Sequence, residues 1–231
     1  MQRRPSMQQQ QQGRAERSEA QRSAGRLAEC GPQAASLAPD RFLALAQDLG
    51  ATAAVLLPAD VLVINDRYAA LCAAPHRCPS YGLTPGCPPH APSPAAFRAC
   101  LAGYRLVLVF KIDAPAADLL SDNRKSVAQA IHRIAAGLEQ AARSSGFARA
   151  RGMAAGSCRE LFCADEADCA VLHGARPCRH PDLARPSISA VGIDFAALAA
   201  QAGWPFARID ADAAVGSEPA MGLMAGLVLL D

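Results

Sequence analysis

The central stretch of the chain, residues 106–145, reads LVLVFKIDAPAADLLSDNRKSVAQAIHRIAAGLEQAARSS. Residues 106–112 form an uninterrupted apolar run of strand length. In residues 121–145, Val127, Ile131, Ile134, Leu138 and Ala142 recur at spacings of three and four, which marks the apolar face of an amphipathic helix. A long helix that follows a strand so closely favours a domain in which helices and strands intermix.

Further elements are expected on both sides of this stretch. Asp40 and Ser93 are suitable N-caps, Gly50 is a suitable helix end, and Ser187 can cap a further short helix. We expect helices over 40–49, 93–102 and 195–202, and strands or extended segments over 53–57, 61–64, 147–153, 206–209 and 222–230. The pattern predicts a single α/β or α+β domain over residues 37–231, with a mixed sheet and two cysteine-rich loops.

The first 36 residues differ in composition from the rest. They contain a glutamine run followed by Arg, Ser and Ala, with almost no branched or aromatic side chains, which predicts a disordered leader. Six of the chain's 23 basic residues and three of its 21 acidic residues lie there, so the remaining 195 residues carry a net charge of −1. A basic tail that touches RNA or membrane, and an organelle transit peptide, are the alternatives; we expect neither a nucleic-acid nor a membrane partner.

The chain has nine cysteines. An odd count, without a charged, apolar and small-residue signal at the start, argues against a secreted disulfide scaffold and predicts a reducing, cytoplasmic setting. The sequence contains no uncharged apolar run of 18 or more residues, the length that a membrane-spanning helix needs.

Most of the cysteines fall into two irregular segments. The first cysteine loop (residues 69–94) contains seven prolines between positions 75 and 94, too many for a central strand. The second cysteine loop spans residues 154–186. Clustered cysteines in the loops of a cytosolic protein indicate metal ligands. The candidate ligands are Cys72, Cys78 and Cys87 in the first loop, and Cys158, Cys163, Cys169 and Cys178 in the second.

The spacing of these cysteines bears on the metal. Zinc sites usually present a Cys-x-x-Cys pair, and this sequence has none: five and eight residues intervene in the first loop, and four, five and eight in the second. An iron-sulfur cluster tolerates wider spacing because each iron needs only one thiolate, and Cys78-Pro79 and Cys87-Pro88 resemble the ends of iron-sulfur ligand runs. We therefore expect an iron-sulfur cluster, with zinc as the alternative.

Seven thiols allow two arrangements. A four-cysteine cluster in the second loop could accompany a three-cysteine site in the first, completed by His76, His90, water or a substrate. Alternatively, the two loops share one metal site, and some of the seven cysteines are not ligands.

Several other residues have simpler interpretations. Cys100 is expected to be a small core residue of a helix, Cys30 an exposed thiol of the leader, and His132 a surface or boundary residue. His180, two residues after Cys178, is the best histidine for a role as a ligand or as support for one. The arginines around the second loop either offset thiolate charge or belong to a mixed solvated surface: Arg149, Arg151, Arg159, Arg176, Arg179 and Arg185.

An ordered set of motifs extends over most of the expected domain. The motifs are Cys78-Pro-Ser-Tyr-Gly, Cys87-Pro-Pro, Ala155-Gly-Ser-Cys158, Cys178-Arg-His-Pro181, and Ala184-Arg-Pro-Ser187 leading to Gly192-Ile-Asp194. In these motifs, between about residues 61 and 204, the chain resembles a prokaryotic family described as predicted metal-binding proteins, to which no reaction is assigned. The resemblance implies that the family's metal-binding cysteines are Cys78, Cys87, Cys158, Cys163, Cys169 and Cys178.

Three functions compete at this point. The leading hypothesis is a metal-binding protein with an iron-sulfur cluster that serves in electron transfer, or as an accessory to a redox enzyme, with an unidentified redox partner protein. A zinc-stabilised structural or binding module is the alternative. An enzyme with Cys163 or Cys87 as nucleophile is the third, although no motif pairs either with a base. The sequence contains no phosphate-binding loop, metalloprotease helix motif or nucleophile elbow.

Overall fold

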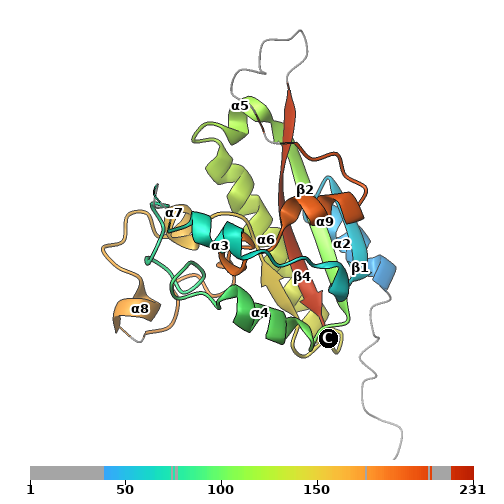
Figure 1. Cartoon of the computed structure of the whole chain (residues 1–231), viewed down its shortest axis with the longest axis horizontal. Coiled ribbons are helices and arrows are strands. Elements are labelled where there is room, and N and C mark those ends of the chain that lie inside the picture. Colours follow the sequence, from blue (N-terminus) through green and yellow to red (C-terminus); the bar gives the residue numbers. More distant parts are fainter. Residues whose placement is uncertain (1–38, 74, 76–77, 175, 208, 210–219) are drawn as a thin grey trace, which may run out of the picture. The chain divides into compact units, whose positions relative to one another are not determined.

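The computed structural model describes residues 39–231, apart from 74, 76–77, 175, 208 and 210–219 (Figure 1). The predicted disordered leader, with Cys30, and the candidate ligand His76 lie outside the described residues.

The described strands form one four-stranded sheet in the order β1-β2-β4-β3. The strands are β1 (Ala53–Pro58), β2 (Leu106–Pro115), β3 (Arg151–Met153) and β4 (Met221–Leu230). All three pairs of neighbouring strands are antiparallel, with Val109 of β2 opposite Val55 on one side and Leu227 on the other. Of the two predicted classes, the α+β class is therefore confirmed. The mixed character expected of the sheet is limited, among the described residues, to one isolated parallel bridge between Ala154 and Ser187.

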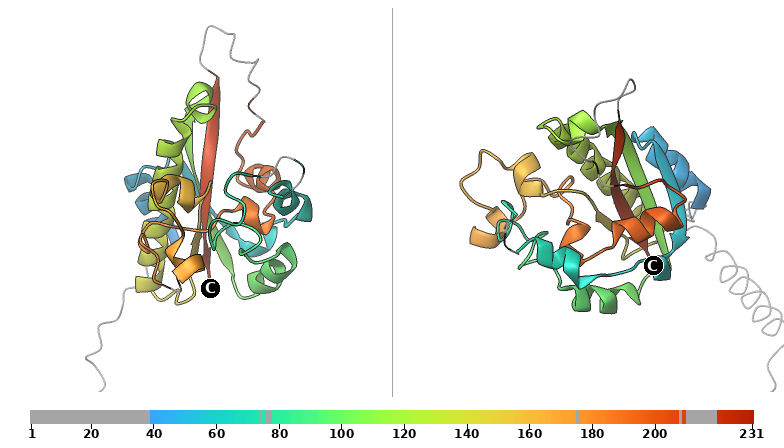
Figure 2. Two further views of the ribbon diagram at one scale, coloured as in Figure 1. Left: turned by 90° about the vertical axis from the view of Figure 1, so that its left-hand side faces the viewer. Right: turned by 45° about the horizontal axis from the view of Figure 1, so that its top comes forward.

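Helices cover both faces of this sheet, as the edge-on view in Figure 2 shows. On one face, Leu108 and Phe110 of β2 pack with α2 (Pro39–Asp48) and α6 (Arg124–Ser144). On the other face, Val107 and Val109 pack with α4 (Pro94–Leu101) and α9 (Phe195–Gln201). Successive residues of a strand point to opposite faces, so a strand covered on both sides must be apolar throughout. This explains the uninterrupted apolar run that begins β2.

The long amphipathic helix predicted over 121–145 is confirmed as α6. Its predicted apolar face packs on the sheet, where Ile131, Ile134 and Leu138 are fully buried. The helices predicted over 40–49, 93–102 and 195–202 are confirmed as α2, α4 and α9, and the Ser93 side chain caps α4 by accepting from the Ala96 N–H at 3.2 Å.

The connecting segments contain short elements. These are η1 (Ala59–Val61), α3 (Asp66–Leu71), α5 (Ala116–Leu119), α7 (Cys158–Phe162), α8 (Ala170–Gly174) and η2 (Ser189–Val191). The strand predicted over 61–64 is wrong, because the chain turns at η1 and only Ile64 pairs, in a bridge to Ile193. The strand predicted over 147–153 is shorter, because residues 147–150 form a turn closed by the Ala150 N–H and the Phe147 carbonyl at 3.0 Å.

Two further expectations fail locally. Ser187 does not cap a helix, since it pairs with Ala154 and η2 begins two residues later without a side-chain cap. Residues 206, 207 and 209 form no strand, and residue 208 lies outside the described part. In the portion of the chain that the structure describes, no helix combines the length and the apolar character that crossing a membrane requires.

Candidate metal centre

The two cysteine loops lie side by side although β2, α6 and β3 separate them in sequence (Figures 1 and 2). They meet where the N–H of Ser187, the residue directly after the second loop, donates to the Gly86 carbonyl of the first loop at 3.3 Å. A Cβ atom on Gly86 would lie only 3.0 Å from Cα of Pro186, so a side chain at this position would push the loops apart. Glycine at position 86 therefore allows the close contact between the two loops.

Thr84 connects the cysteines of the two loops. Its side chain is buried, with a residue exposure of 1%, and its hydroxyl accepts a hydrogen bond from the Gly86 N–H at 2.9 Å. The same hydroxyl acts to lower the pKa of two thiols, those of Cys87, in the first loop, and Cys158, at the start of α7 in the second. Ser157, the residue before α7, does not cap that helix. Its buried hydroxyl acts to lower the pKa of Cys87 and has no hydrogen-bond partner among the described residues.

The thiols interact electrostatically across the two loops. In the first loop the Cys78 N–H donates to the Cys72 carbonyl at 3.0 Å. Negative charge on Cys78 or Cys87 would raise the pKa of Cys72. Negative charge on Cys87 of the first loop, or on Cys163 or Cys178 of the second, would raise the pKa of Cys158. Six of the seven predicted ligands therefore lie near enough for a negative charge on one to raise the pKa of another: Cys72, Cys78, Cys87, Cys158, Cys163 and Cys178.

Burial sets the protonation of these thiols. It raises the pKa of Cys158 to about 11, against the opposing effect of the Thr84 hydroxyl. Burial also raises the pKa of Cys87, while the Ser157 and Thr84 hydroxyls lower it, and burial likewise raises the pKa values of Cys72 and Cys163. Because a metal binds the thiolate, each of these ligands would have to release a proton on binding.

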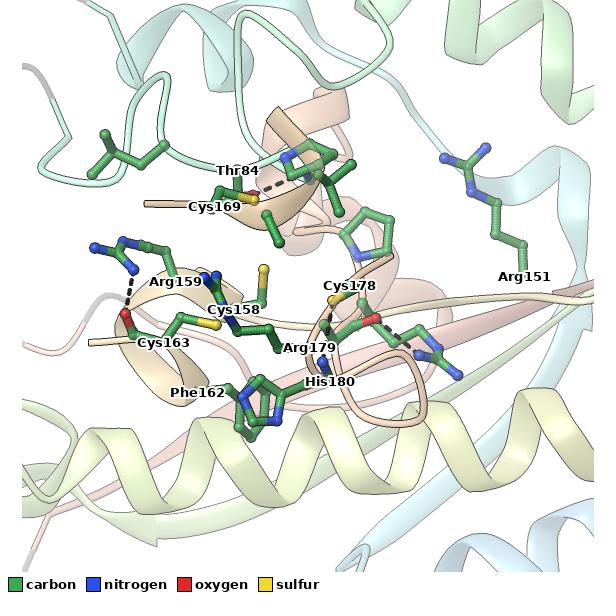
Figure 3. A pocket seen from close by; sticks show the side chains of 18 residues that line it. Thr84, Arg151, Cys158, Arg159, Phe162, Cys163, Cys169, Cys178, Arg179 and His180 are labelled. Atoms are coloured by element: carbon green, nitrogen blue, oxygen red, sulfur yellow. Dashed lines mark hydrogen bonds between the residues drawn. The ribbon is translucent and has the colours of Figure 1, made fainter. Parts of the chain in front are cut away.

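Cys169, the seventh predicted ligand, joins the group through a cavity. This cysteine cavity, of about 370 Å³, is lined by Cys158, Cys163, Cys169 and Cys178 of the second loop together with Thr84 and Gly86 of the first (Figure 3). The backbone carbonyl of Cys169 accepts from the His173 N–H at 2.9 Å, so this residue is held at the start of α8. Both loops therefore form the walls of one cavity.

Two of the predicted arginines hold the second loop together. Arg159 of α7 donates to the carbonyls of Cys163 and Glu166, while Arg179 pairs with Glu166 at 3.2 Å and with Asp168 at 3.4 Å. Their charges also lower the pKa of Cys163, although burial outweighs them and raises it. These arginines therefore act electrostatically on a thiol, as one of the two predictions had it, and they also bond loop carbonyls and carboxylates, which was not predicted.

Aromatic rings close one side of the cysteine cavity. The ring of Phe162 lies 5.8 Å from the ring of His180. The main-chain N–H of His180 donates to Sγ of Cys178 at 3.4 Å. His180 lies beside Phe162 and Cys178 in the wall of the cavity (Figure 3), but it is the main-chain N–H of His180 that bonds Cys178, so the role predicted for the imidazole stays a prediction.

His132 supports this wall from behind, and the expectation of a surface or boundary residue is wrong. It is fully buried on α6, its ring is 5.3 Å from that of Phe162, and its Nδ1 accepts from the Arg185 N–H at 3.0 Å. Burial lowers its pKa to about 4, so it is neutral at pH 7. The signal that could have located it is the second row of buried residues beside the apolar face of α6, Ala128, Ala135 and Glu139.

The remaining candidates lie at the surface or at an element end. Cys72 follows α3 and is half-buried, whereas Cys100 is exposed on α4, so the predicted core position of Cys100 is wrong. Its helix buries Phe97 instead, one turn earlier. His90 is exposed. All eight described cysteines are free thiols.

The donors fit a thiophilic metal in chemistry, although they do not yet surround one. Thiolates favour zinc, copper(I) and iron-sulfur clusters. The buried hydroxyl of Ser157, which has no hydrogen-bond partner among the described residues, acts to lower the pKa of the Cys87 thiol. Within the described ranges, no three Cys, His, Asp or Glu side chains are arranged to hold a single ion.

The comparisons with known proteins identify the family. The family model described as Predicted metal-binding protein (DUF2284) matches residues 55–230, from β1 to the end of β4, and the chain therefore belongs to this family. The match covers both cysteine loops and the sheet, apart from the first two residues of β1. No curated protein and no solved structure matches the chain.

Proposed function

We propose that this member of the family binds an iron-sulfur cluster between its two cysteine loops, and that it serves in electron transfer or as an accessory to a redox enzyme. The single observation that carries the proposal is the position of Cys87 and Cys158, which come from different loops and lie near enough to the buried Thr84 hydroxyl for it to act on the pKa of both thiols. Two cysteines that are distant in sequence and lie near one buried hydroxyl are difficult to explain as ordinary core residues, because core cysteines need no polar group beside them.

The distribution of the thiols supports a cluster over one ion. Six cysteines that act on one another's pKa values extend over two loops. A cluster presents several irons, each of which needs one thiolate, so it can collect ligands from a wider area. Zinc held in a structural site is the alternative.

The chain's own residues would give such a centre its surroundings. When bound, a cluster would supply one-electron transfer. Thr84 and Ser157 would donate hydrogen bonds toward thiolates, while Arg159 and Arg179 would keep the second loop closed and reduce its negative charge. The rings of Phe162 and His180 would limit the access of water from one side. We extend the proposal to a redox partner protein, which would accept or supply the electron.

The test is the metal content of protein purified without oxygen. We expect iron and acid-labile sulfide in comparable amounts, together with a visible absorption band that bleaches on reduction. Cys87→Ser and Cys158→Ser should each lose most of the iron, whereas Cys100→Ser, which changes an exposed cysteine on α4, should retain it. A colourless protein with stoichiometric zinc and no sulfide would contradict the proposal and favour the zinc module.

A further inference from the structure

A second cavity adjoins the cysteine cavity and has a different character. It has a volume of about 610 Å³, within the usual range for small-molecule sites. We call it the arginine cavity, after four arginines in its wall: Arg143, Arg149, Arg151 and Arg185. It shares Arg151, Ala184, Arg185 and Pro186 with the cysteine cavity, so a ligand in it would lie next to the second cysteine loop.

The buried acid of this cavity is already neutralised. Glu139, with a residue exposure of 7%, accepts from the Gly152 N–H at 2.6 Å and pairs with Arg143 at 3.0 Å and Arg185 at 2.9 Å. A Cβ atom on Gly152 would lie 2.9 Å from Oε2 of Glu139, so glycine permits this arrangement. Glu139 therefore cannot serve as the counter-ion of another arginine.

A third arginine is also occupied. Arg149 pairs with Asp231 at 3.5 Å, donates to the Gly103 carbonyl at 2.7 Å, and lies 5.9 Å from the centre of the Tyr104 ring. Asp182, the other acid in the wall, is exposed and forms no ion pair with any arginine in the described part of the chain. The wall thus holds two more arginines than acids, and its buried acid, Glu139, is already paired with two of the arginines.

Arg151 is the arginine without a counter-ion. Its side chain, at the start of β3, is partly buried and lines both cavities, yet it makes no hydrogen bond and no ion pair with any residue that the structure describes. A guanidinium offers a planar fork of donors that matches the two oxygens of a carboxylate or a phosphate. A partly buried guanidinium that faces two cavities without a partner is therefore suited to a ligand.

We infer that the arginine cavity binds a small oxyanion, a molecule bearing a carboxylate or phosphate group, and that Arg151 makes the principal contact with it. The ligand would lie beside the proposed metal centre, so an electron from the centre, or a change in the ligands of its metal, could act on it. The inference does not depend on which metal the cysteines hold, since every residue that carries it lies in the wall of the second cavity.

The test is calorimetric titration of the full chain with pyrophosphate and, separately, with citrate, at low ionic strength. We expect at least one to bind, and the affinity to fall about tenfold or more in Arg151→Gln, the loss of one charge-assisted contact. Arg133→Gln is the matched control: it removes the same charge from an exposed arginine of α6 that, among the described residues, also has no partner. Binding only of pyrophosphate would indicate a phosphate ligand, and binding only of citrate a carboxylate.

Three results would overturn the inference: no binding of either anion, equal affinities in the wild type and Arg151→Gln, or equal losses in Arg151→Gln and Arg133→Gln. Thermal unfolding would show whether each variant is folded. If Arg151→Gln is not, the same comparison is made between Arg151→Lys and Arg133→Lys, which keep the charge but lose the fork. The metal content of each sample is measured as well, so failure of the cluster proposal and failure of this inference give different results.

Discussion

The sheet and the two cysteine loops are held in place by different kinds of interaction. The sheet, α2 and α6 enclose side chains such as Phe110 and Ile131 that are completely buried and apolar. The loops depend on single polar contacts, such as those of Thr84 and Arg159. A core of many similar contacts loses stability in proportion to the volume removed, whereas a loop held by a few hydrogen bonds loses its arrangement when one of them is lost. Four predictions probe this difference.

The largest effect is expected in the sheet. Phe110→Ala removes a fully buried ring from β2 and should reduce the free energy of unfolding by about 3–5 kcal/mol. Urea unfolding measures the loss, and Val63→Ala, at an exposed position, should change it by less than about 0.5 kcal/mol. Similar losses in the two variants would show that the sheet is not the stable region.

The second effect depends on pH and concerns the contact between the two regions. Burial holds the pKa of His132 at about 4 in the folded protein, below its ordinary value of 6.5. The unfolded state therefore takes up the proton first, and stability present above pH 6.5 is lost as the pH falls toward 4, by about 3 kcal/mol.

Urea unfolding at several pH values between these limits checks this. His132→Gln should show a weaker pH dependence than the wild type, whereas His90→Gln, at an exposed position, should keep the wild-type dependence. The prediction is wrong if the two variants depend on pH equally.

The third effect belongs to the junction of the loops. Thr84→Val keeps the shape of the side chain but leaves the Gly86 N–H without its acceptor, which should cost about 1–3 kcal/mol and lower the metal content. Thr52→Val is the control, since the Thr52 hydroxyl is exposed and bonds the Lys111 carbonyl at the sheet. Equal metal contents in the two variants would exclude Thr84 from the centre.

The smallest effect on global stability is expected for Arg159→Ala. It removes two side-chain bonds to the backbone of the second loop and should cost about 1 kcal/mol. Hydrogen exchange should accelerate at the amides of Cys163 and Glu166, while those of β2 stay protected. Faster exchange throughout β2 would show that loop and sheet open together.

The sequence predicted the sheet region well because periodicity reports burial directly. The spacing of Ile131, Ile134 and Leu138 predicted α6, and the apolar run of β2 required cover on both faces. Failures occurred where a single local contact decides the structure. Asn65 starts α3 by accepting from the Arg67 N–H, and the turn at η1 replaces the strand predicted over 61–64. Such contacts leave no periodic signal.

The candidate site was predicted by residue type and not by arrangement. Cysteine clustering indicated both loops, and four of the seven predicted cysteines, Cys158, Cys163, Cys169 and Cys178, line one cavity together with Thr84 and Gly86 of the first loop. Thr84 and Ser157 escaped notice because a lone hydroxyl in a loop has no distinguishing pattern. Arg151 could be named as one of several arginines near the loop, but its lack of a counter-ion is visible only when Glu139 and Arg149 are seen with their partners.

Because α6 packs on the sheet and also on the second cysteine loop, only some mutations of this helix can be accepted in evolution. Ile131 points into the sheet and His132, the next residue, backs the ring of Phe162. One residue inserted upstream would rotate everything after it by about 100° and spoil both surfaces together. We therefore expect related chains to vary α6 by exchanging side chains at fixed length, and to tolerate added residues in surface turns instead.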